Sequence, residues 1–158
     1  MTPPPQCKTP GLLSPSRWRQ RRVSRRAELE AVYRAAWYEV KTPDKNVRRF
    51  RVGERVPELD TLAAEKGWAW LSAFNPGSQL LSESENLQRH QALLNNLVNT
   101  QRAFLPAASG DDTGQWPVEH AVCLLNIDEI TARALAIRHG QAAFLHAQPG
   151  EAVRLCWV

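Results

Sequence analysis

Hydrogen-bonding side chains follow one another at short intervals between an apolar run and an amphipathic one: Asn75, Ser78, Ser82 and Asn86. Amide and hydroxyl groups of this kind hold a ligand through hydrogen bonds. The chain contains no P-loop sequence, no GxGxxG sequence and no nucleophile with an evident base beside it. These residues therefore indicate a binding site, and they leave open whether the protein is an enzyme and which residues would be catalytic.

The backbone around these residues also has a predictable shape. In Asn75-Pro76-Gly77-Ser78, proline presets φ at the second position of a type II surface turn, and glycine accepts the positive φ of the third. Ser82 and Glu85 have the spacing of a capping box, which places the start of a helix at Ser82. A helix N-terminus presents unpaired amides and the positive end of the helix dipole, and this favours anions. The expected ligand is therefore small and polar or anionic.

Charged and polar residues elsewhere in the chain are predicted to lie beside the Asn75 turn and the helix start at Ser82, at the same edge of the sheet. Arg49 and Arg51 are two residues apart on an expected strand, so both project from the same face. They form either a positive wall beside the Asn75 turn or a solvated edge strand. Glu119 and Gln141 supply polar groups at strand ends and complete the set of predicted binding residues.

Neither a metal nor a cofactor is predicted. Asp111 and Asp112 lie in a long expected loop, where aspartate is an ordinary turn residue. The alternative is a metal or general-base role together with the nearby Glu119 and His120. The three cysteines are too far apart for a zinc site or a disulfide framework, and Cys123 and Cys156 are expected to be buried. None of the four histidines has metal-ligand spacing, and His90 is expected to be a partly exposed helix residue.

Hydrophobic periodicity and breaker residues predict the elements that position these side chains. Helices are expected over Arg26–Trp37, from Pro57 to just before Gly67, from Ser82 onward, and from Ile127 to a C-terminal cap at Gly140. Strands are expected over Tyr38–Lys41, Arg49–Val52, Trp68–Phe74, Ala103–Ala107, His120–Leu125, Ala142–Ala147 and Ala152–Trp157. Because the run Trp68–Phe74 is nearly all apolar, it should be a central strand covered on both faces.

The residues that define the two longer helices of the domain are also predicted, with an inward face for the first of them. In the helix that starts at Ser82, the residues expected to point inward are Leu87, Leu94, Leu97 and Val98, and those expected to point largely outward are Asn86, Arg89, Gln91 and Asn95. The helix before Gly140 is defined by Ile127, Ile130, Ala134 and Ile137.

From Trp68 the expected order is strand, helix, strand, strand, helix, strand, with one strand added. This order predicts an α+β fold with a ferredoxin-like βαββαβ core, in which a mainly antiparallel sheet has its helices on one face. The first helix and hairpin form an N-terminal extension. Residues 27–158 are expected to be a single domain, preceded by an arm over residues 1–26.

The arm is rich in proline and arginine and is expected to be disordered. It holds one lysine and six arginines without an acid, so its charge is +7. Because the whole chain has a net charge of +4, the remainder has a net charge of −3. No apolar run is long enough for a membrane span or a signal peptide, so the protein is expected to be cytoplasmic.

Several motifs occur in an order and spacing known from one family: the strand end and turn from Ala73 to Ser78, followed by Ser82 and Glu85-Asn86. They are followed by Gly110, Trp116-Pro117, Glu119 and His139-Gly140-Gln141. In these motifs the chain resembles the bacterial family called domain of unknown function 3293. The resemblance covers roughly residues 28–158, and it implies a fold and a polar edge but no established activity.

These observations support one main function and leave two alternatives open. The main hypothesis is that a small polar or anionic ligand binds at the edge around Asn75–Ser82. The first alternative is a protein-interaction or regulatory module without catalysis, for which ferredoxin-like sheets are common scaffolds. The second is a nucleic-acid-associated protein that binds through the basic arm over residues 1–26.

Overall fold

The protein was analysed as a computed structural model that describes residues 15–158, with side chains from residue 25 onward. It divides into two compact units at Val32. Helix α1 spans Pro15–Ala35, so residues 15–26, expected to be disordered, are helical, and the helix begins well before Arg26. Cys7 and the first fourteen residues lie outside the described part of the chain. The boundary between arm and domain at residue 26 stays a prediction.

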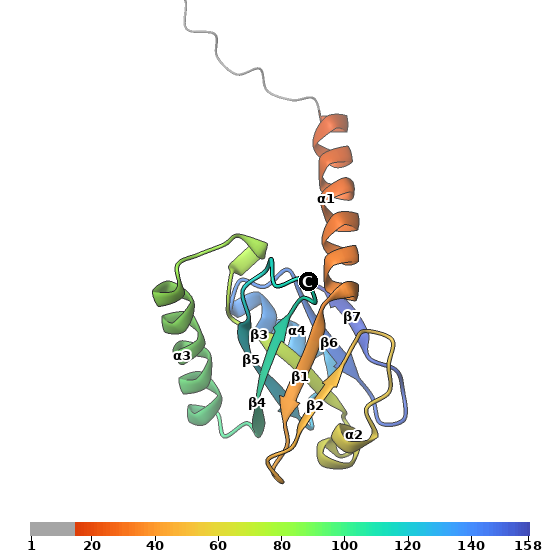
Figure 1. Cartoon of the computed structure of the whole chain (residues 1–158), viewed down its shortest axis with the longest axis vertical. Helices are drawn as coiled ribbons and strands as arrows, with labels where there is room; N and C mark the ends of the chain where they lie inside the picture. Colours follow the sequence, from red (N-terminus) through yellow and green to blue (C-terminus); the bar gives the residue numbers. More distant parts are fainter. Residues whose placement is uncertain (1–14) are drawn as a thin grey trace, which may run out of the picture. The chain divides into compact units, whose positions relative to one another are not determined.

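The second unit, Tyr33–Val158, is built on a seven-stranded sheet in the order β2-β1-β4-β5-β3-β6-β7 (Figure 1). Its strands are β1 (Trp37–Lys41), β2 (Val47–Phe50), β3 (Trp68–Ser72), β4 (Phe104–Gly110), β5 (Glu119–Leu125), β6 (Ala143–Ala147) and β7 (Arg154–Trp157). Every neighbouring pair is antiparallel. The sheet curls, so that Gly53 after β2 donates a 2.8 Å backbone hydrogen bond to Val153 before β7. The fold is thus α+β, as predicted.

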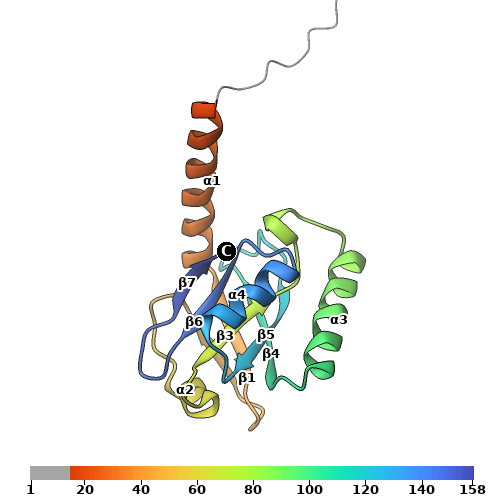
Figure 2. The same ribbon diagram turned by 180° about the vertical axis from the view of Figure 1, so that it is seen from behind.

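Helices cover both faces of the sheet. α3 (Glu83–Asn99) and α4 (Glu129–Arg138) lie on one face (Figure 2), and the short α2 (Pro57–Ala63) packs on the other. Along β3, Trp68 and Trp70 belong to the core on the α2 face, whereas Ala69 and Leu71 belong to the core under α3 and α4. All five residues of β3 are buried, which confirms the prediction of a central strand covered on both sides.

Several strand boundaries differ from the prediction, and those of β4 and β2 are decided by pairing with β1. β4 was expected to end at Ala107 but continues to Gly110, because its last residues pair with β1 up to the Trp37–Gly110 position. A side chain at Gly110 would run into the indole of Trp37, so glycine suits this close approach. β2 was expected over Arg49–Val52 but spans Val47–Phe50, in register with β1.

The predicted inward face of α3 was partly wrong, and two of the residues that define α4 are exposed. In α3, Leu87 and Val98 are exposed, and the buried residues are Asn86, Leu93 and Leu97. In α4, Ile130 and Ile137 are exposed at 82% and 58%, and the buried residues are Ala132, Leu135 and Ala136. The buried face of α4 therefore consists of two alanines and one leucine, and the larger isoleucines of the helix point away from the core.

Within residues 15–158, no helix combines the length and the apolar character that crossing a membrane requires. Cys123 and Cys156 are both buried, as expected.

A matched pair of glycines tests the packing that delivers the chain into β3. Gly67 and Gly150 have nearly equal positive φ values, +82° and +81°, but only at Gly67 would a side chain meet backbone, at the carbonyl of Ala147. Gly67→Ala should therefore lower the free energy of unfolding by about 1–3 kcal/mol more than Gly150→Ala. Urea denaturation of both variants measures the difference. Equal losses would show that only the backbone angle matters.

Candidate functional site

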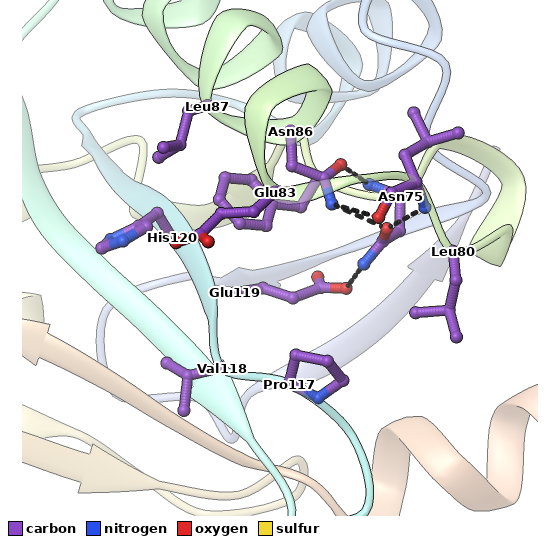
Figure 3. A pocket seen from close by; sticks show the side chains of 11 residues that line it. Asn75, Leu80, Glu83, Asn86, Leu87, Pro117, Val118, Glu119 and His120 are labelled. Atoms are coloured by element: carbon purple, nitrogen blue, oxygen red, sulfur yellow. Dashed lines mark hydrogen bonds between the residues drawn. The ribbon is translucent and has the colours of Figure 1, made fainter.

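A cavity of about 400 Å³ opens where β3 ends, α3 begins and the chain enters β5 (Figure 3). Figure 3 shows Leu87 and His120 on one side of the cavity and Leu80 on the other. Its lining consists of Phe74, Asn75, Leu80, Leu81, Glu83, Asn86, Leu87, Pro117, Val118, Glu119 and His120. Three of the predicted binding residues, Asn75, Asn86 and Glu119, thus meet in one cavity.

The chain turns at the predicted residues, as a short 3-10 turn over Pro76–Ser78. Ser78 donates its backbone N–H to the carbonyl of Asn75 at 2.9 Å, and Gly77 has φ +63° and ψ +20°, close to the third position of a type II turn. Asn75 itself has φ +46°, a left-handed conformation that asparagine tolerates better than most residues. The turn was expected to lie at the surface, but Asn75 is only 4% exposed.

A reciprocal pair of amides explains why Asn75 is buried. The backbone N–H of Asn75 donates to Oδ1 of Asn86 at 2.8 Å, and Nδ2 of Asn86 donates to Oδ1 of Asn75 at 2.9 Å. Oδ1 of Asn75 also accepts the backbone N–H of Leu81 at 2.9 Å. The pair joins the end of β3 to the first turn of α3. Asn86 was predicted to point outward, and its burial corrects that prediction: the polar end of α3's inner face meets a polar partner.

Glu119 extends this network into the cavity. Its Oε1 accepts Nδ2 of Asn75 at 2.6 Å and Nε1 of Trp116 at 3.0 Å. Its Oε2 has no hydrogen-bond partner among the described residues, and the side chain is half-buried at the cavity wall. A carboxylate held at one oxygen can accept further donors at the other. Glu119 is thus positioned to contact a ligand.

Three other predicted binding residues support the loop from outside the cavity lining. The hydroxyl of Ser78 is hydrogen bonded to the hydroxyl of Tyr33, and Nε2 of Gln141 donates to the carbonyl of Phe74 at 3.0 Å. Ser82 forms the predicted capping box with Glu85, and hydrogen bonds from Ser82 lower the pKa of that carboxyl. Their interactions position the backbone of the site.

The two predicted arginines are engaged elsewhere. Arg49 pairs with Glu39 at 2.9 Å and stacks over the ring of Trp37, with Cζ 3.9 Å from the centroid. Arg51 pairs with Asp112 at 2.7 Å. Neither lines the cavity, whose lining contains no lysine or arginine. A role for them in ligand binding stays a prediction.

The predicted set of ligand-binding residues did not include the apolar part of the lining or His120, which the sequence had indicated only for a metal or general-base role. Leu80, Leu87 and Val118 are exposed at 62%, 44% and 56%. Leu87 was assigned to the core because the face of α3 was misjudged. The adjacency of Glu119 and His120 was the available sign that both would reach one site. No group of three or more histidine, cysteine or acidic residues able to hold a metal occurs within the part of the chain that the structure describes.

The amide pair gives a stability prediction with a control on the same helix. Asn86→Ala removes the partner of a buried backbone N–H, so it should lower the free energy of unfolding by about 1–3 kcal/mol. Asn95→Ala changes the same residue type on the exposed face of α3, where only Gln91 is hydrogen bonded to it, and should cost less than about 0.5 kcal/mol. Urea denaturation compares the variants, and a similar loss in both would argue against the pair.

Comparison with known proteins finds one matching family model and no matching individual protein. No curated protein and no solved structure matches the chain. A family model described as "Protein of unknown function (DUF3293)" matches residues 71–144. This span includes every residue of the cavity lining. Residues 71–144, with the cavity they form, thus carry the DUF3293 match, which confirms the family that the sequence motifs resemble.

Proposed function

We propose that the cavity binds a small ligand with a hydrogen-bond-donating or positively charged head and an apolar body. The supporting observation is Oε2 of Glu119, an acceptor at the cavity wall without a partner among the described residues. Glu83 is a second carboxylate in the lining. A ligand N–H or ammonium group would complete the hydrogen bonding of Glu119 and balance this negative charge.

The apolar lining supports the second half of the proposal. Leu80, Leu87 and Val118 stay exposed around the cavity mouth although each is a large apolar side chain. Apolar walls with a few convergent polar groups are typical of small-molecule sites. Covering these side chains with an apolar ligand body would remove their surface from water.

The proposal modifies the ligand class expected from the sequence. An anionic ligand was favoured by the helix N-terminus of α3 and by Arg49 and Arg51. The cavity has no lysine or arginine in its lining, and Glu83 lies in the first turn of α3. The carboxylates oppose the helix dipole, so a neutral or cationic head is the better match.

We also propose that the core is ferredoxin-like. The support is that β4-β5-β3-β6 are neighbours in that order and are antiparallel throughout, with α3 and α4 on one face. This places the cavity at the end of the central strand β3. Ligands often bind at such ends, because loops and helix starts meet there.

Three probes with one apolar body and different heads test the ligand class: phenethylammonium, 3-phenylpropionamide and 3-phenylpropionate. At pH 7.5, heteronuclear NMR titration of the full chain should show shifts in residues of the cavity lining. The ammonium should bind at least about threefold more tightly than the carboxylate, because the lining is acidic.

Glu119→Gln keeps the side-chain shape and an acceptor for Asn75 or Trp116, and it should abolish most of the preference for ammonium over carboxylate. Glu151→Gln, an exposed carboxylate outside the lining, is the matched control and should leave the preference unchanged. Two results would contradict the proposal. One is the absence of shifts in the cavity lining with all three probes, and the other is a Glu119→Gln variant that prefers ammonium over carboxylate as strongly as the unchanged protein does.

A further inference from the structure

Two histidines from different elements meet at the cavity. His90 lies on α3 and His120 on β5, and their ring centroids are 5.7 Å apart. The ring of Phe74 packs edge-on against both, with centroids 6.0 Å from His90 and 5.5 Å from His120. His120 belongs to the cavity lining, whereas His90 is half-buried and does not. The pair is thus coupled to the cavity through His120 and Phe74.

The charged groups around the pair come from two elements. α3 contributes Glu83 in the lining and the exposed Arg89, which precedes His90, and β5 contributes Glu119. β3 and β4, on either side of β5, consist of uncharged residues, WAWLS and FLPAASG. Histidine is the side chain whose ordinary charge change falls near neutral pH. The two histidines are therefore the groups at this side of the cavity that are suited to change their charge in that range.

We infer that the His90–His120 pair sets which ligand charge the cavity accepts, shifting it from ammonium toward carboxylate when the pair takes up a proton. This inference rests on the proposed function. With both rings neutral, Glu83 and Glu119 determine the charge of the wall. A proton on the pair adds positive charge beside them, which repels an ammonium head and attracts a carboxylate.

The surroundings of His90 support a pair that takes up a single proton. Burial, followed by the neighbouring His120, lowers the pKa of His90 below its ordinary value. Two positively charged rings at this separation repel each other, so the second proton is resisted. Nδ1 of His90 is buried and has no hydrogen-bond partner among the described residues, so no carboxylate is bonded to this nitrogen.

The test is the pH dependence of binding by the same full chain. Between pH 7.5 and 5.5, where both probe charges persist, the dissociation constant of phenethylammonium should rise at least about threefold, and that of 3-phenylpropionate should fall. His120→Gln should flatten both dependences. His139→Gln changes a half-buried histidine outside the lining and should keep them.

The outcomes separate this inference from the proposed function. Tight ammonium binding at pH 7.5 that does not change down to pH 5.5 would overturn the histidine pair and leave the proposed ligand class standing. A pH dependence that survives His120→Gln would also overturn it. If no probe binds at either pH, both proposals are lost.

Discussion

The site depends on the reciprocal hydrogen bonds between Asn75 and Asn86. A chain that leaves a buried strand for a helix must satisfy its backbone groups while it turns, because an unpaired buried N–H is costly. Asn86 satisfies the N–H of Asn75, and Asn75 satisfies the N–H of Leu81. The amides thus replace backbone pairing where β3 has already ended. The same side chain of Asn75 holds Glu119, so the geometry of the turn and the direction of the carboxylate are fixed together.

Local chemistry explains what could be predicted from the sequence. The turn at Pro76-Gly77, the capping box at Ser82 and the burial of Trp68–Ser72 each follow from residues that are adjacent or a few positions apart. Backbone angles, a cap three residues away and a continuous apolar run need no knowledge of the tertiary fold. The order of strands and helices from β3 onward followed from the same signals, and with it the meeting of Asn75, Asn86 and Glu119.

What failed depends on distant partners. α3 has leucines on more than one side, so its periodicity does not determine which face is buried. Packing placed Leu93 and Leu97 inward and turned Leu87 toward the cavity mouth. The destination of Arg49 and Arg51 depends on Glu39 and Asp112, which come from a neighbouring strand and a distant loop. A charge pattern within one strand shows which face a side chain takes but not the carboxylate it will meet.

The charge of the cavity wall follows from this division of partners. The arginines pair with other acids, and Glu119 is held by uncharged donors, the amide of Asn75 and the indole of Trp116. Neutral donors stabilise a carboxylate without cancelling its charge. The charge of Glu119 also acts on Tyr38. Burial chiefly, followed by Tyr33 and then Glu119, raises the pKa of the Tyr38 hydroxyl, which donates a hydrogen bond to the carbonyl of Tyr33. A negative wall with no fixed cation is left, where a ligand head or a protonated histidine can supply the missing charge.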